Sequence, residues 1–128
     1  MGDPQGIGPE VIVKALPHLQ RIAHWTLFGH RRFLEKAARM SRQNLPRQLT
    51  IVEPTGRPPP LQSKDKKQRG EASLSYIQEA VRTIQEGTCR GLVTGPLCKA
   101  HIEAAGCPYP GHTELLAALA GARQTFLM

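Results

Sequence analysis

The sequence has 128 residues, 40% of them hydrophobic and 21% charged, and these values fit one globular domain with its own apolar core. It has no run of roughly 18 consecutive apolar residues, as a membrane span needs, and its first residues lack the basic and apolar regions of a signal peptide. The net charge of +7 raises nucleic-acid binding as an alternative, but much of this charge lies in one short run without interleaved aromatic residues, which favours a solvated basic loop.

The first half of the chain predicts two helices and two strands. Gly8-Pro9-Glu10 opens a helix, because proline suits a first-turn position and glutamate favours the positive end of the helix dipole. Apolar residues then recur at helical spacing, and we expect Pro17 to limit the run. A strand, a helix and a second strand are predicted to follow at His24 to Gly29, Arg31 to Met40 and Leu49 to Val52.

The second half begins with Pro54 to Arg69, which carries four prolines and five basic residues and is predicted to be a surface loop. A helix is predicted from Ala72 to Glu86, capped by Gly87. The remaining predicted elements are a strand at Gly91 to Thr94, a helix at Leu97 to Ala105, a helix starting near Thr113 and a strand at Gln124 to Met128. This alternation predicts a single α/β domain over residues 1–128, with a mostly parallel sheet and flanking helices.

The first candidate motif is the glycine-rich segment of residues 2–10, GDPQGIGPE. Its three glycines allow a ligand to approach the backbone closely, and the helix that follows offers free N–H groups. The segment is not a dinucleotide-binding fingerprint, because Val11 stands where the third glycine would be and no strand precedes it. Taken alone, the motif is better explained as a tight turn into a helix.

The second motif is VTGPLCK at residues 93–99, where a predicted strand ends in a Gly-Pro turn before a helix. Parallel α/β sheets present ligand-binding groups at such positions. Lys99 in the first helical turn could hold an anion, or it could simply face solvent. The spacing does not match a phosphate-binding P-loop.

The third motif is YPGHTE at residues 109–114. Thr113 is a natural N-cap residue, and Glu114 suits the first turn of a helix. His112 would stand just outside the helix start, where its ring could bind a ligand near neutral pH, although a lone histidine is more often a surface or packing residue.

The sequence predicts no metal site within this chain. The other histidines lack the H-x-x-x-H and H-E-x-x-H spacings, and a catalytic zinc site usually has three protein ligands. The cysteines Cys89, Cys98 and Cys107 are odd in number and lack C-x-x-C spacing. They predict reduced thiols in a cytoplasmic protein.

Taken together and in this order, the three motifs resemble the 4-hydroxythreonine-4-phosphate dehydrogenase family of pyridoxal phosphate biosynthesis. The segment Gly70-Glu71-Ala72-Ser73 at the start of the central helix fits the same pattern. The resemblance implies a fold like the isocitrate and isopropylmalate dehydrogenases, with two α/β domains and an active site at a homodimer interface. It also implies oxidation of a secondary alcohol by NAD or NADP, followed by decarboxylation.

In this family the histidine and threonine of the GHTE motif contact the substrate, so the resemblance assigns substrate binding to His112 and Thr113. A divalent metal (Zn, Mg or Co) is held by three histidines that fall later in the family's sequences, and none of them can be matched here. Catalytic and cofactor-binding residues stay unassigned. Relatives with the same motifs act on phosphorylated sugar acids or cyclic diol carboxylates, so the substrate within the family stays open.

The chain is shorter than the family, and the strand expected before the first motif is missing. We therefore expect the N-terminal part of a longer two-domain dehydrogenase, truncated and inactive alone. Its expected partner is a phosphorylated small molecule, with neither nucleic acid nor membrane. The alternatives from other classes are a small basic nucleic-acid-binding protein that uses residues 64–69 and an inactive structural remnant.

Overall fold

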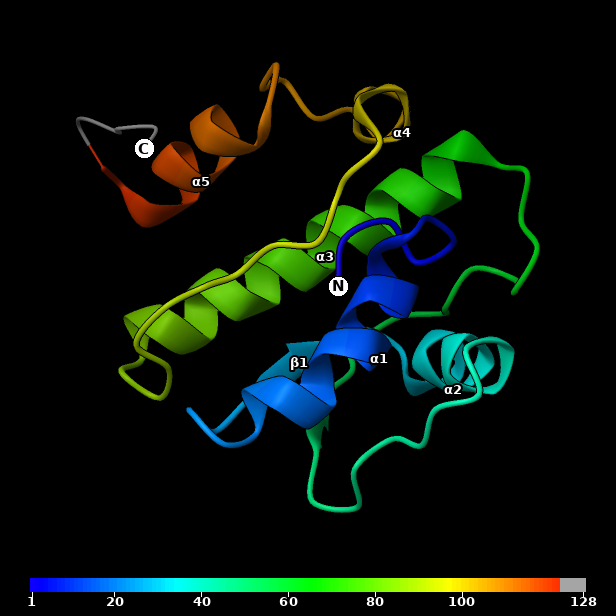
Figure 1. Ribbon diagram of the computed structural model, residues 1–128. Coiled ribbons are helices and arrows are strands. Elements are labelled where there is room, and N and C mark those ends of the chain that lie inside the picture. The colour runs from blue at the N-terminus through cyan, green and yellow to red at the C-terminus, as the bar shows by residue number, and fades with distance from the viewer. Residues whose placement is uncertain (123–128) are drawn as a thin grey trace.

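The computed structural model describes residues 1–122 as an α/β arrangement built around one long helix (Figure 1). The elements in chain order are α1 (Gly8–Leu19), β1 (Thr26–Phe28), α2 (Arg31–Met40), β2 (Thr50–Val52), α3 (Lys66–Gln85), α4 (Lys99–Ala104) and α5 (His112–Ala120). Within this part of the chain, no helix combines the length and apolar character needed to span a bilayer.

The sheet in the described residues consists of β1 and β2, which pair in parallel with Leu27 opposite Ile51. Helix α2 connects the two strands, so this region is a compact βαβ unit. Both strands were predicted, and α2 has the predicted bounds and buries the predicted residues Phe33, Leu34, Ala37 and Ala38. The predicted α/β class with a parallel sheet is therefore confirmed.

The strand predicted at residues 91–94 is wrong for the described structure. These residues run beside α3 without strand pairing, and Val93 is 77% exposed while Leu92 packs against the α3 clusters (Figure 1). An apolar run reports a tendency to be buried, whereas a strand also needs a neighbouring backbone to pair with. The strand predicted at Gln124 to Met128 lies outside the described residues, which end at residue 122.

Helix α3 begins at Lys66, six residues before the predicted start at Ala72, so the end of the predicted basic loop is helical. Asp65 caps the helix, with its carboxylate accepting a hydrogen bond from the Gln68 N–H at 3.2 Å. Lysine and glutamine are good helix formers, and their charge or polarity does not oppose a helix. At the other end, Gly87 has a φ of 78° and follows the last turn, as predicted.

The remaining helices differ from the predictions only at their ends or faces. Helix α1 continues two residues past Pro17 to Leu19, and Val11 is exposed whereas Val13 is buried. Helix α4 is shorter than predicted, at six residues.

Helix α3 is the centre of the core: its residues Tyr76 and Ala80 pack against Phe28 of β1, and Ile77 and Val81 pack against Leu115 of α5.

Candidate functional site

The first two motifs meet as adjoining loops. The Asp3 N–H donates to the Pro96 carbonyl at 3.0 Å. A Cβ atom on Gly2 would lie 2.5 Å from that same oxygen, and a Cβ on Gly95 would lie 2.3 Å from the Met1 carbonyl oxygen. The backbones are therefore too close for any side chain at these two glycines, which explains why the sequence has glycine in both turns.

The carboxylate of Asp3 is the centre of this contact region and is only 4% exposed. Arg69 binds it in a bidentate manner, with Nε 3.1 Å from Oδ1 and Nη2 2.6 Å from Oδ2. Nδ1 of His101 lies 3.1 Å from Oδ2, and the Gln5 N–H donates to Oδ1 at 3.0 Å. Each carboxylate oxygen thus has two partners, as a buried charge requires.

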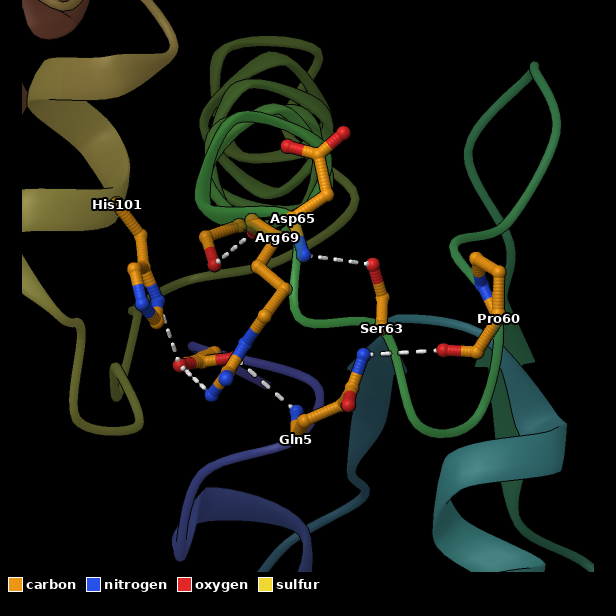
Figure 2. Close-up of polar contacts among 8 residues, drawn as sticks. Gln5, Pro60, Ser63, Asp65, Arg69 and His101 are labelled. Atoms are coloured by element: carbon orange, nitrogen blue, oxygen red, sulfur yellow. Dashed lines mark hydrogen bonds and ion pairs between the residues drawn. The ribbon is translucent and has the colours of Figure 1, made fainter.

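These partners come from separate parts of the chain. Arg69 extends from the first turns of α3 and His101 from α4, and Figure 2 shows both side chains pointing toward the same point beside Gln5. The side-chain amide of Gln5 also donates to the Pro60 carbonyl at 3.0 Å, which attaches the proline-rich loop to the glycine-rich loop. The cluster of Asp3, Arg69 and His101, which we name the Asp3 cluster, fixes the glycine-rich loop to α3 and α4.

The surroundings hold Asp3 in its charged form. Burial by itself would raise the pKa of its carboxyl, but hydrogen bonds from Arg69 and Gln5, the charge of Arg69 and the neighbouring His101 together lower it. The carboxylate has all its hydrogen bonds satisfied inside the protein. Its geometry suits a structural role better than proton transfer.

Gly70 explains how α3 and α4 come close enough to share this cluster. A Cβ at Gly70 would lie 1.9 Å from the His101 carbonyl oxygen, so only glycine fits between the two helices. Gly70 belongs to the segment that resembles the dehydrogenase family. In the sequence it directly follows Arg69 of the Asp3 cluster. Lys99, the first residue of α4, is exposed to solvent.

His112 and Thr113 are the first two residues of α5, and they lie side by side in its first turn. The predicted cap at Thr113 is wrong: the N-cap is Gly111, in extended conformation with a φ of −160°, and no side chain caps this helix. The N-cap thus lies two residues earlier than predicted, because Gly111 adopts the extended cap conformation that was assigned to Thr113. Both side chains are half-buried.

The ring of His112 has a feature expected of a binding group. Its Nε2 is shielded from solvent and has no hydrogen-bond partner among the described residues. Burial lowers the pKa of His112, so its ring is neutral at pH 7. A shielded ring nitrogen without a partner carries a desolvation cost that a bound hydrogen-bonding ligand would remove.

A recess with a volume of about 610 Å³ lies beyond the carboxyl ends of β1 and β2. It is lined by His30, by residues 54–60 and by one face of the start of α3. His30 is 5% exposed, its Nδ1 lies 2.7 Å from the Tyr76 hydroxyl, and burial lowers its pKa. This recess was not predicted, because His30 was noted only for lacking metal-ligand spacing.

Residues 1–122 contain no group of three or more His, Cys, Asp or Glu side chains that could hold a metal ion. The divalent metal implied by the resemblance therefore does not fit this set of residues, and no metal-dependent step is assigned to them.

Comparison with known proteins decides the family. The family model described as pyridoxal phosphate biosynthetic protein PdxA matches residues 10–128. The chain belongs to this family. It is 35% identical to a 4-hydroxythreonine-4-phosphate dehydrogenase of Synechococcus sp. (strain JA-3-3Ab), over 97% of this chain and 39% of that protein. A protein of the same name from Beijerinckia indica is 33% identical, over 100% of this chain and 42% of its own length.

The fold agrees with a solved structure of the same enzyme name. The crystal structure of a 4-hydroxythreonine-4-phosphate dehydrogenase from Burkholderia phymatum superposes with a TM-score of 0.85 and 30% sequence identity. The alignment covers 97% of this chain and 43% of that one. The chain thus spans about two fifths of the length of the relatives it matches.

The Asp3 cluster was not predicted from the sequence. Asp3 is separated from Arg69 by 66 positions and from His101 by 98, so no local spacing connects them. The available signals were indirect: an acidic residue between glycine and proline, and an arginine directly before a glycine. Arg69 was instead counted as part of a solvated basic loop.

Proposed function

We propose that this chain is part of an NAD- or NADP-dependent dehydrogenase that oxidises 4-hydroxythreonine 4-phosphate, or a related phosphorylated hydroxy acid, in pyridoxal phosphate biosynthesis. The observation that carries the proposal is membership in the PdxA family over residues 10–128, together with relatives named as this dehydrogenase. The domain would be the N-terminal part of a two-domain, isocitrate dehydrogenase-like homodimer. A divalent metal would be held by residues beyond those described.

Within that enzyme, His112 and Thr113 would bind the substrate. Support comes from the shielded Nε2 of His112 and from its lowered pKa, because a neutral ring can donate or accept a hydrogen bond without bringing a charge. Their neighbouring positions in the first turn of α5 would let one ligand contact both side chains. Such contacts act by orienting the substrate relative to the nicotinamide ring.

The direct test is an assay of NAD and NADP reduction with 4-hydroxythreonine 4-phosphate, run on the 128-residue chain and on a protein with the full length of its relatives. We expect turnover only from the longer protein. Turnover by the 128-residue chain would overturn the claim that it is an incomplete part. Absence of turnover from the metal-loaded longer protein with this substrate and with phosphorylated sugar acids would overturn the proposed activity.

The rival function is nucleic-acid binding through residues 64–69, and in the structure one cation of this run is paired inside the protein. Arg69 points inward and binds Asp3, and Lys67 lies 3.9 Å from Glu71. If the rival were correct, affinity for DNA would fall steeply with salt, and replacing Lys64, Lys66 and Lys67 with serine would abolish it. We expect weak binding that these substitutions leave unchanged.

A further inference from the structure

The recess of about 610 Å³ has the position and the size of a small-molecule site. His30 follows the carboxyl end of β1 and Pro54 follows that of β2, and both line the recess. Parallel α/β proteins bind their ligands at this edge of the sheet. The recess lies apart from His112, because it borders the first half of α3, whereas α5 packs further along α3 in the cluster of Ile77 and Val81.

One lining residue, His30, has a buried ring nitrogen without a partner. The residue is 5% exposed, and its Nδ1 lies 2.7 Å from the Tyr76 hydroxyl. Its Nε2 is shielded from solvent and has no hydrogen-bond partner among residues 1–122. A buried polar atom that lacks its hydrogen bond costs free energy, and a ligand that supplies the bond recovers it.

Tyr76 decides which kind of partner this nitrogen needs. Burial raises the pKa of Tyr76, so its hydroxyl keeps its proton, and burial lowers the pKa of His30, so the ring is neutral at pH 7. If the hydroxyl donates to Nδ1, the ring proton is on Nε2. The opposite tautomer would leave the hydroxyl proton without an acceptor in the described part of the chain. Nε2–H of His30 is therefore a donor, and its ligand has to present an acceptor.

The wall formed by residues 54–60 is apolar and held in place. Four of these seven residues are prolines, whose rings are apolar and fix the backbone. Gln5 holds the wall at Pro60 (Figure 2), and Nζ of Lys36 donates to the Leu61 carbonyl at 3.1 Å. A preformed apolar wall of this kind suits a ring-shaped ligand.

The mouth of the recess is positively charged. Arg57 lines it and is exposed, and none of the ion pairs formed within residues 1–122 includes Arg57. Glu71 on the α3 side lies 3.9 Å from Lys67, which offsets its negative charge. The uncompensated charge therefore favours an anionic group at the outer end of a ligand.

We propose that this recess binds a small ring-shaped monoanion, with its ring against the proline wall, a carbonyl oxygen or ring nitrogen at Nε2 of His30, and its anionic group beside Arg57. Thr55 and Gly56 are exposed, so this part of the wall can adjust as the acceptor reaches the shielded nitrogen. The inference does not depend on the dehydrogenase activity. The three sequence motifs all lie within the described chain, and no residue of theirs lines the recess.

Three probes separate the parts of this ligand. 4-Acetylbenzoate has the ring, the acceptor and the anion, 4-isopropylbenzoate has nearly the same shape without the acceptor, and acetophenone lacks the anion. Their affinities for the 128-residue chain are measured by NMR titration of the backbone amides of residues 55–57 and 68–75. The variants are His30→Phe, which keeps an aromatic ring without the donor, and Arg57→Gln. Arg47→Gln is the matched control, because Arg47 is exposed and lies outside the recess.

We expect 4-acetylbenzoate to bind with a Kd on the order of 1 mM. 4-Isopropylbenzoate should bind about tenfold more weakly, because it leaves the His30 donor unpaired. Loss of the anion in acetophenone, or of the cation in Arg57→Gln, should weaken binding by about two- to fivefold, and Arg47→Gln should leave it unchanged. In His30→Phe the two benzoates should bind equally.

Equal affinity of the two benzoates for the unaltered chain overturns the proposal, and so does a titration that shows no saturation at residues 55–57 by about 10 mM. Should His30→Phe fail to fold, the ring-nitrogen resonances of His30 in the unaltered chain carry the same test. The Nε2 resonance should shift with 4-acetylbenzoate and stay in place with 4-isopropylbenzoate. An equal shift with both probes, or none with either, would contradict the assigned hydrogen bond.

Discussion

Replacing Asp3 by asparagine would remove the charge at the centre of the Asp3 cluster while preserving the shape of the side chain. Asparagine can still accept a hydrogen bond from the Gln5 N–H. The Arg69 guanidinium, however, loses its only ion-pair partner in the described structure, and its side chain is 21% exposed. Removing one partner of a buried pair costs roughly 3–5 kcal/mol, because the remaining charge stays buried without compensation.

We expect a value near the lower end, about 3 kcal/mol, because Arg69 is partly exposed and can turn toward water. For a chain of this size this corresponds to a drop in Tm of about 10 °C. Urea unfolding followed by circular dichroism measures the free energy. Glu10→Gln is the matched control, since the Glu10–Lys14 pair is exposed and should contribute under about 0.5 kcal/mol.

Two further results would check the cause. The double variant Asp3→Asn/Arg69→Met should be more stable than Asp3→Asn alone, because no unpaired cation remains. Since the folded pKa of Asp3 is lowered, its contribution is present above the unfolded pKa of about 3.9 and is lost as the pH falls through the folded pKa. If Asp3→Asn destabilises the protein no more than Glu10→Gln does at pH 7, the cluster does not hold the loop.

Three other predictions follow from the described contacts. Gly70→Ala should lower the free energy of unfolding by more than about 2 kcal/mol, because its Cβ would clash with the His101 carbonyl. In the control Gly91→Ala, nothing lies within 4 Å of the added Cβ, and the free energy of unfolding should change by under about 0.5 kcal/mol. Thr113→Ala should cost less than about 0.5 kcal/mol of stability, since Gly111 is the N-cap, and a loss near 1 kcal/mol would restore Thr113 as the cap. Burial lowers the pKa of the Met1 amine to about 6 in the folded protein, so the free energy of unfolding should fall by roughly 2–3 kcal/mol as the pH drops from about 8 to about 6. A chain with an acetylated N-terminus should lose this pH dependence.

Helix positions were predictable where one face is apolar and the ends carry standard signals. α2 has the predicted bounds and buried residues, and Gly87 ends α3 as expected. The start of α3 was missed because lysines and prolines were weighed as loop signals, while the capping carboxylate of Asp65 and the inward-pointing Arg69 were not recognised. Residues 91–94 show the converse error, since pairing depends on a neighbour that their own sequence does not reveal.

In the candidate site, too, the local features could be predicted and the contacts between distant segments could not. The three motifs lie at turns and helix starts, as their glycines and prolines predicted, because those residues restrict the backbone locally. The contacts between motifs could not be predicted, since the cluster joins Asp3 to residues 66 and 98 positions away. The shielding of His112 Nε2 likewise depends on packing between distant segments.

The most direct test of the proposed function is the effect of His112→Ala on kcat/KM for 4-hydroxythreonine 4-phosphate, in a protein that carries these residues within the full length of its relatives. His18→Ala is the control, because His18 is exposed at the end of α1. We predict a loss of about 100-fold for His112→Ala, the scale of misplacing a reacting group, with metal content and His18→Ala activity unchanged. Normal kinetics for His112→Ala, or a loss explained entirely by lost metal, would contradict the account.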